Sequence, residues 1–198
     1  MTGNITGTKR FRFFVVFLLT VSRGPLAVSF AVLFLTVGPG WTRIVLGLFL
    51  LAAMELTDLL DGFVARRFGV VTEWGAALDP YMDSFSRLTV YWTLACAGLI
   101  LPLVPLVMAV RDVTVAYCRI FLARAGHTVA ANWSGKFKAV VQAVVILTIM
   151  ASVNLFGKEN AELARLSLWA MGALTAVTVW SGVDYVLGYL KIVGPAKD

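Results

Sequence analysis

Long apolar runs dominate the chain, and short segments rich in turn residues separate them. The runs cover residues 24–37, 44–66, 76–100, 102–124, 138–156 and 163–190. The breaks contain strong turn formers, such as Gly38-Pro39-Gly40 and the Leu101-Pro102 step. A helix needs ~20 residues to cross the ~30 Å hydrocarbon core of a bilayer, and most of the runs reach or approach this length. The pattern therefore predicts an all-α integral membrane protein with six transmembrane helices.

The N-terminal segment has a different character. Lys9, Arg10 and Arg12 precede a run of seven apolar residues that ends at Leu19. This run is too short to span a bilayer, and no small-residue cleavage site of a signal peptide follows it. We therefore expect residues 1–23 to form an amphipathic helix that lies in the membrane interface. The first span would be short unless this helix continues into it.

The composition supports lipid as the surrounding solvent. The chain has 198 residues, of which 60% are hydrophobic and 14% are charged, whereas soluble domains are about 45–50% apolar and ~25% charged. A single domain over residues 1–198 is expected at this length. The net charge is +6, but the basic residues gather at the ends of apolar runs and form no strip with exposed aromatics. Nucleic-acid binding is therefore not expected.

The placement of lysine and arginine predicts the orientation of the spans. One side collects most of them, and the opposite side has few. The richer side would hold Lys9, Arg10, Arg12, Arg23, Arg66, Arg67, Arg124, Lys136, Lys138, Lys191 and Lys197, and the poorer side Arg43, Lys158 and Arg165. This bias places both termini and the second and fourth connections in the cytoplasm.

Four aspartates form the main candidate site. Asp58 and Asp61 are three residues apart, and Asp79 and Asp83 are four apart, so on helices each pair projects from one face. Both pairs lie towards the cytoplasmic ends of two consecutive antiparallel spans, which brings four carboxylates to one depth. Charged residues inside apolar spans cost ~2.5–3.5 kcal/mol each on insertion scales and usually mark function.

Clustered carboxylates in a low dielectric repel one another unless they are neutralised. Hard divalent cations, Mg²⁺ or Mn²⁺, prefer carboxylate oxygens and share their coordination with substrate phosphates, and two-metal sites are common in phosphoryl displacement. The alternative is a set of buried ion pairs with arginines. The arginines considered for this role are Arg66, Arg67, Arg87, Arg111 and Arg119. Four carboxylates at this spacing favour the metal site.

The residues around the aspartates sharpen this interpretation. Gly62 and Ala65 share the aspartate face and leave room for a ligand, and Arg66 can bind a phosphate by charge-assisted hydrogen bonds. The segment from Asp58 to Asp83 resembles the signature of the CDP-alcohol phosphatidyltransferase family, D-x2-D-G-x2-A-R-x8-G-x3-D-x3-D. The resemblance implies the six-span helical fold of that family with an N-terminal interfacial helix, usually as a homodimer.

The same resemblance implies roles for individual residues. Asp58, Asp61, Asp79 and Asp83 would hold two metal ions, and Gly62, Ala65, Arg66 and Gly75 would line the CDP pocket. Asp83 would also be the general base that takes the proton from the hydroxyl of the acceptor. The acceptor oxygen then attacks the lipid-bearing phosphorus and CMP leaves, a step that suits a carboxylate base beside metal-stabilised phosphate charge.

A second, basic cluster is the candidate site for a phosphorylated acceptor. It comprises Arg111, Arg119, Lys136 and Lys138. Two alternatives stay open: Arg111 could pair with the neighbouring Asp112, and the two lysines could be ordinary cytoplasmic anchors.

A narrower resemblance bears on the identity of the acceptor. Arg111-Asp112, Arg119, Gly135-Lys136-Phe137-Lys138 and the segment from Trp180 to Tyr185 resemble the bacterial family members that make phosphatidylglycerophosphate. This implies CDP-diacylglycerol and sn-glycerol 3-phosphate as substrates at the bacterial inner membrane. Ser84 and Ala139 depart from that pattern, where lysine and threonine are usual. Inositol phosphate or another polyol is therefore the alternative acceptor.

Two hypotheses of other classes compete with the enzyme. A divalent-cation transporter could use the four aspartates as a transit site, but it would need carboxylates reachable from both sides of the membrane. It would also give no reason for Gly62, Ala65 and Arg66 at fixed spacing. A non-catalytic scaffold would not need a costly acidic set inside its spans. The pattern favours the transferase.

Overall fold

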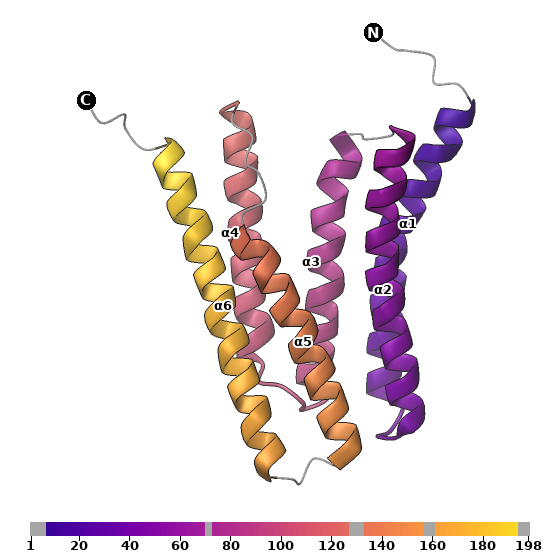
Figure 1. Ribbon diagram of the computed structural model, residues 1–198, viewed down its shortest axis with the longest axis vertical. Coiled ribbons are helices and arrows are strands. Elements are labelled where there is room, and N and C mark those ends of the chain that lie inside the picture. Colours follow the sequence, from indigo (N-terminus) through magenta and orange to yellow (C-terminus); the bar gives the residue numbers. More distant parts are fainter. Residues whose placement is uncertain (1–6, 70–72, 127–132, 157–160, 194–198) are drawn as a thin grey trace. The chain divides into compact units, whose positions relative to one another are not determined.

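The computed structural model describes residues 7–69, 73–126, 133–156 and 161–193. These residues form α-helices joined by short connections (Figure 1). The helices are α1 (Gly7–Thr36), α2 (Trp41–Phe68), α3 (Glu73–Cys96), α4 (Leu103–Arg124), α5 (Trp133–Phe156) and α6 (Ala161–Val193). The described part of the chain contains no strand, which confirms the all-α prediction. Each apolar run predicted from the sequence coincides with one helix.

The first helix differs from the expected arrangement. α1 is one continuous helix with Pro25 inside it, so no break separates an N-terminal helix from the first predicted span. Residues 7–23, the described part of the segment expected to lie in the interface, form the first half of α1. A helix of 30 residues is about 45 Å long at a rise of ~1.5 Å per residue, which explains why the run after residue 23 looked short on its own.

The chain folds as two compact units, Met1–Ala97 and Gly98–Asp198. The first unit contains α1, α2 and α3. α1 packs against both α2 and α3, whereas α2 and α3 have little direct contact with each other among the described residues. Gly24 of α1 is buried, and a Cβ placed on it would lie 2.9 Å from the Cε atom of Met82 on α3. The missing side chain therefore permits the close approach of α1 and α3.

The second unit repeats this arrangement with α6 as the shared helix. α6 packs against both α4 and α5. Its buried Leu174 and Met171 belong to the apolar core of the unit, to which Met108 of α4 and Ile149 of α5 also contribute. Each unit is thus organised around one long helix that packs against two others.

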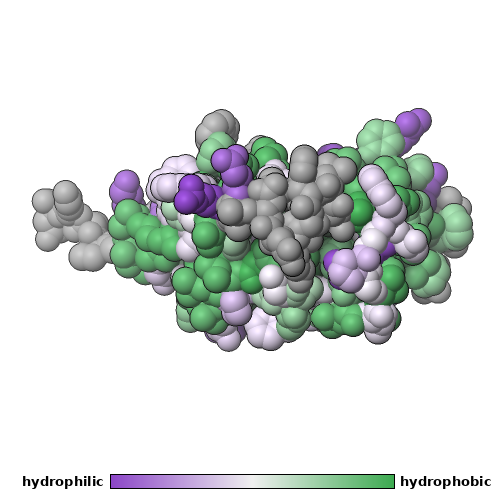
Figure 2. Space-filling view, turned by 90° about the horizontal axis from the view of Figure 1, so that it is seen from below, coloured by the Kyte–Doolittle hydropathy of each residue, from purple (hydrophilic) through white to green (hydrophobic). Residues whose placement is uncertain are grey.

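Two of the helices are long and apolar enough to cross a membrane, namely Phe11–Thr36 within α1 and Arg165–Val193 within α6. α2, α3 and α4 carry several charged residues along their lengths, which lowers their mean hydropathy. Many large apolar side chains are exposed on all of these helices, and apolar residues cover much of the face shown in Figure 2. Such a surface suits lipid better than water. Lys158 and Lys197, which entered the orientation argument, lie outside the described residues.

Candidate metal and phosphate sites

Three of the four predicted aspartates come together in the first unit. Asp58 and Asp61 of α2 and Asp79 of α3 each offer a carboxylate oxygen, and these oxygens all lie within 4.8 Å of one another. The side chain of Asp61 is 6% exposed, whereas those of Asp58 and Asp79 are 35% and 54% exposed. The cluster therefore has a buried base and an open side through which a ligand can enter.

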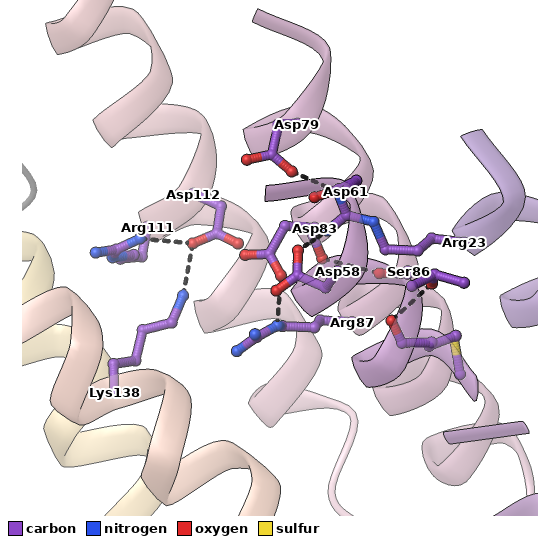
Figure 3. Close-up of polar contacts among 12 residues, drawn as sticks. Arg23, Asp58, Asp61, Asp79, Asp83, Ser86, Arg87, Arg111, Asp112 and Lys138 are labelled. Carbon is purple, nitrogen blue, oxygen red and sulfur yellow. Dashed lines mark hydrogen bonds and ion pairs between the residues drawn. The ribbon is translucent and has the colours of Figure 1, made fainter. Parts of the chain in front are cut away.

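An arginine from α1 lies at the centre of this cluster (Figure 3). Arg23 is 1% exposed. Its Nη1 donates to Oδ1 of Asp58, and its Nη2 donates to Oδ2 of Asp61 at 3.0 Å and to Oδ1 of Asp79. One guanidinium thus joins carboxylates from two helices. Buried ion pairs between the aspartates and an arginine were the alternative to a metal site in the sequence analysis. Such pairs are present, but they involve Arg23, which was not among the arginines named there.

A hydroxyl from the same helix supports the buried carboxylate. Thr20 lies one turn before Arg23 on α1, and its Oγ1 donates to Oδ2 of Asp61 at 2.9 Å. Oδ2 of Asp61 therefore accepts two hydrogen bonds from α1. Charge-assisted bonds of this kind are roughly twice as strong as neutral ones, and here they fix the orientation of the Asp61 carboxylate.

Asp83 lies outside this group of three. It is on α3, one turn after Asp79, and Nε of Arg87 donates to its Oδ1 at 2.8 Å. The Asp83 side chain is 42% exposed, and Figure 3 shows it beside Asp58. Its second carboxylate oxygen accepts no hydrogen bond from the described residues. Asp83 is thus an accessible carboxylate beside the cluster, held through one oxygen only.

The donor set fits a hard divalent cation. Arg23 engages one oxygen each of Asp58, Asp61 and Asp79, and each carboxylate has a second oxygen that Arg23 does not engage. These remaining oxygens are the ligands that Mg²⁺ and Mn²⁺ prefer. Asp58, Asp61 and Asp79 are therefore the residues that would hold such an ion, and Arg23 offsets only one of their three charges.

The second unit contains a cluster of the opposite charge (Figure 3). Asp112 of α4 accepts hydrogen bonds at its Oδ1 from Nη1 of Arg111 at 2.9 Å and from Nζ of Lys138 on α5 at 2.8 Å. Nη2 of Arg111 also donates to Oγ of Ser181 on α6 at 2.8 Å. The pairing of Arg111 with Asp112, left open from the sequence, is therefore present, and it includes Lys138.

Two glycines give Arg111 its room. A Cβ placed on Gly182 of α6 would lie 3.1 Å from Cγ of Arg111, and one on Gly135 of α5 would lie 3.7 Å from its Nη2. Arg111 thus runs from α4 past the backbones of both neighbouring helices. These glycines belong to segments that the sequence resemblance singled out, and the close approach at Gly182 supplies a physical reason for glycine there, whereas a Cβ at position 135 would make an ordinary contact.

The remaining polar contacts of this unit also join helices. Arg119 of α4 is exposed, its Nε donates to the Tyr185 hydroxyl at 3.3 Å, and its guanidinium lies 5.6 Å from the centre of that ring. Oγ of Ser134 donates to Oδ2 of Asp184 at 2.7 Å, so Asp184 takes part in a structural hydrogen bond. The side chain of Lys136, the fourth predicted acceptor ligand, lies outside the described residues.

Comparison with known proteins decides the family. The profile of the CDP-alcohol phosphatidyltransferases matches residues 14–180, most of the chain. The chain belongs to the CDP-alcohol phosphatidyltransferase family. The prediction made from the aspartate signature is therefore confirmed, and the match includes the helices that carry both charged clusters.

Several curated members of this family are similar in sequence. A "Probable phosphatidylglycerophosphate synthase" of Mycobacterium tuberculosis is 31% identical over 143 residues, which are 72% of this chain and 65% of that protein. A "CDP-diacylglycerol--glycerol-3-phosphate 3-phosphatidyltransferase" of Bacillus subtilis is 30% identical, over 68% of this chain and 69% of that protein. A protein of the same description from Salmonella typhimurium is 31% identical, over 85% of this chain and 91% of that protein. The match thus spans slightly less than two thirds of the mycobacterial relative.

The other residues of the family signature also lie near the aspartates in the chain. Gly62 and Ala65 are partly buried on α2, and Arg66 is exposed one turn after Gly62. The Arg66 guanidinium lies against Gly62, 3.5 Å from the place where a Cβ would stand. Gly75 is partly buried on α3. Their role in binding CDP, as the family signature implies, remains a prediction.

Sequence reasoning missed the central role of Arg23 and Thr20. Arg23 entered the sequence argument only as a residue of the cytoplasmic side, and the structure adds that it is buried among the carboxylates. A signal was present, because an arginine inside a continuous apolar run is costly. The first apolar run was taken to begin at residue 24, so Arg23 was interpreted as a residue at the end of a helix.

Proposed function

We propose that this chain transfers the phosphatidyl group of CDP-diacylglycerol to sn-glycerol 3-phosphate, giving phosphatidylglycerophosphate and CMP. The observation that carries the proposal is the three-carboxylate cluster, formed by residues of a family signature on two different helices. The names of the relatives describe the same reaction. Phospholipid biosynthesis is the resulting process.

The residues of the first unit would carry the chemical step. A hydroxyl oxygen of the acceptor attacks the phosphorus that bears diacylglycerol, and the bond from that phosphorus to the oxygen of CMP breaks. The hydroxyl proton passes to the free oxygen of Asp83, while Arg87 holds the other oxygen. Asp58, Asp61 and Asp79, with Asp83, are the proposed holders of one or two Mg²⁺ or Mn²⁺ ions. Such ions stabilise the charge that develops on phosphate oxygens.

Residues of the signature would bind the CDP group. Gly62 and Ala65 present small side chains on α2, and the exposed Arg66, whose guanidinium lies against Gly62, offers five N–H donors to phosphate oxygens. Gly75 is the corresponding small residue of α3. We assign the diphosphate and cytidine of the donor to this set.

The cations of the second unit would bind the phosphate of the acceptor. Arg111 and Lys138 together outnumber the single carboxylate that they share, and Arg119 adds a further guanidinium on the same helix. Lys136, at the start of α5, is the fourth proposed ligand. A dianionic phosphate offers oxygens to several such donors at once.

The membrane placement follows the positive-inside rule. We propose six spans in the bacterial inner membrane, with both termini and the active site on the cytoplasmic side, and a homodimeric assembly as in the family. The apolar exposed surface and the two helices that suffice for a span support a membrane location. The cytoplasmic side is also where the soluble acceptor and the product CMP would be found.

The test is CMP release by the purified protein with CDP-diacylglycerol, Mg²⁺ or Mn²⁺, and a panel of acceptors. Release with glycerol 3-phosphate alone supports the full proposal. Activity should stop when a strong chelator is added and should return with excess Mn²⁺, whereas activity that persists in the chelator would remove the metal from the proposal. Folded protein that releases no CMP with any acceptor would redirect attention to cation transport.

A second acceptor class has specific support. Ser84 and Ala139 replace residues that are usual in glycerol 3-phosphate enzymes, and both are partly buried within helices that carry site residues. Inositol phosphate or another polyol is the alternative that these changes favour. Release of CMP with such an acceptor and not with glycerol 3-phosphate would keep the chemistry and change the product.

A further inference from the structure

Arg23 is the most completely buried charged residue in the described chain, at 1% exposure. Two of its nitrogens bind three carboxylates, while its buried Nε has no hydrogen-bond partner among the described residues. A buried guanidinium with an unsatisfied N–H is costly. Its ion pairs alone do not explain it, because replacing a buried ion pair by apolar residues is often neutral or stabilising. A role in orienting the carboxylates explains why an arginine is buried at this position.

The atoms that Arg23 contacts indicate what this role is. It binds one oxygen of each carboxylate, so each carboxylate keeps a second oxygen that Arg23 does not engage. Thr20 adds its hydroxyl to the Asp61 oxygen that Arg23 already holds. α1 therefore engages one oxygen of each carboxylate, and a cation would bind through the oxygens that α1 does not engage. Partners that orient metal ligands in this way are common features of metal sites.

The packing of the first unit explains why a residue of α1 would hold carboxylates of both α2 and α3. Asp58 and Asp61 belong to α2 and Asp79 belongs to α3, two helices that have little direct contact with each other. α1 packs against both, and Gly24, next to Arg23, allows the close approach to α3. The spatial relation between the carboxylates of α2 and α3 therefore depends on α1.

We propose that Arg23, assisted by Thr20, is a positioning residue that assembles the divalent-cation site by holding one oxygen of each of three carboxylates. The inference rests on the proposed function in that it takes the cluster to bind a divalent cation. It adds a contribution from α1, which provides none of the signature aspartates. A lysine would not substitute, because its ammonium is a compact point charge whereas the planar guanidinium reaches three carboxylates through a fixed fork.

The opposite role is physically distinct and makes the opposite prediction. If Arg23 merely occupied the place of a cation, removing it would vacate the site and strengthen metal binding. If it positions the ligands, removing it lets the carboxylates repel one another and weakens metal binding. The sign of the change in affinity therefore decides between the two roles.

The experiment measures Mn²⁺ binding to purified full-length protein in detergent, without substrates, from the electron paramagnetic resonance signal of free Mn²⁺. We expect Arg23→Gln and Arg23→Lys to weaken Mn²⁺ binding by about 10- to 100-fold, the usual effect of losing a residue that orients metal ligands. The matched control is Arg43→Gln. Arg43 is 6% exposed in the same unit and lies 4.9 Å from the Phe34 ring, with no ion pair among the described residues. Its substitution should leave Mn²⁺ affinity unchanged.

A milder variant guards against loss of folding. Thr20→Val keeps the shape of the side chain and removes the hydroxyl that bonds Asp61 and the Val16 carbonyl of its own helix, so it should weaken Mn²⁺ binding by about tenfold, the lower end for a hydrogen bond to a charged group. Unchanged or tighter Mn²⁺ binding in Thr20→Val and in the folded Arg23 variants would overturn the role of Arg23. Wild-type protein that releases CMP but binds no Mn²⁺ would instead overturn the metal site, which separates the two failures.

Discussion

The two units of this chain share one packing scheme and carry opposite charges. In each, one long helix packs against two others, α1 in the first unit and α6 in the second. The first unit surrounds one guanidinium with three carboxylates, an excess of two negative charges (3 − 1 = 2). The second surrounds the carboxylate of Asp112 with two cations, an excess of one positive charge (2 − 1 = 1).

Under the proposed function, this difference assigns the metal ion to one unit and the acceptor phosphate to the other. Balanced buried ion pairs would need no ligand, but three carboxylates share one guanidinium in the first cluster, and two cations share the Asp112 carboxylate in the second. Excess charge in a low dielectric is costly, so we propose that each cluster favours a ligand of the opposite sign. A divalent cation suits the first unit, and an anionic phosphate suits the second.

Removing one carboxylate from each unit tests this comparison most severely. Asp61→Asn should lower turnover by about 1000-fold, the scale of losing one electrostatic stabiliser of a transition state, and should greatly weaken Mn²⁺ binding. Its amide can still accept the hydrogen bonds of Thr20 and Arg23, so the fold should persist. CMP release and Mn²⁺ binding are the two measurements.

Asp112→Asn is the matched variant in the second unit. Asp61 and Asp112 have similarly buried side chains, 6% and 9% exposed, and each contacts cations. Asp112→Asn should retain Mn²⁺ binding and alter the KM for the acceptor. Loss of Mn²⁺ binding in both variants would mean that the two clusters do not divide the ligands as we propose.

A smaller effect is expected from the cations of the second unit. Lys138→Gln should raise the KM for glycerol 3-phosphate by about 10- to 100-fold, because a hydrogen bond to a charged group contributes ~1.5–3 kcal/mol. The KM for CDP-diacylglycerol should change little. Steady-state kinetics with each substrate varied in turn makes the measurement, and Arg165→Gln, which alters an exposed cation of the same unit, is the control. An equal rise in both KM values would argue against a role in acceptor binding.

Much of this organisation could be predicted from the sequence because it depends on spacing within single helices. The apolar runs predicted the six helices, and the intervals Asp58–Asp61 and Asp79–Asp83 predicted that each pair projects from one face of its helix. The ion pairs of Arg23 could not be predicted in the same way. They join residues 35 to 56 positions apart, and such contacts depend on how helices pack.

The same limit applies to the second unit. Arg111 and Asp112 are adjacent in the chain, so their pairing was one of two open interpretations. The contact of Lys138 with Asp112 crosses from α5 to α4 and had no local signal. The space left by Gly182 beside Arg111 also becomes visible only when α4 and α6 are packed together.

Gly182→Ala would disturb the second cluster without removing a charge. The added methyl would stand 3.1 Å from Cγ of Arg111, near the fixed end of that side chain, so Arg111 must shift by a few tenths of an ångström. A misplacement of about 1 Å can cost ~100-fold, and this smaller shift should raise the acceptor KM by about fivefold. Gly188→Ala on the same helix meets nothing within 4 Å and should leave KM unchanged. Identical kinetics for the two variants would show that the position of Arg111 is unimportant.

Gly24→Ala is the corresponding change in the first unit and should have the smallest effect. The added methyl would stand 2.9 Å from Cε of Met82, the free end of a flexible side chain that can rotate away. Alanine is also favoured over glycine inside a helix by ~1 kcal/mol, which offsets the cost of moving Met82. Mn²⁺ affinity should therefore stay within about twofold of the wild type, with little change in the unfolding temperature. A tenfold loss of affinity would mean instead that the spacing of α1 and α3 at Gly24 sets the position of Arg23 among the carboxylates, and that unit 1 is as sensitive to helix spacing as unit 2.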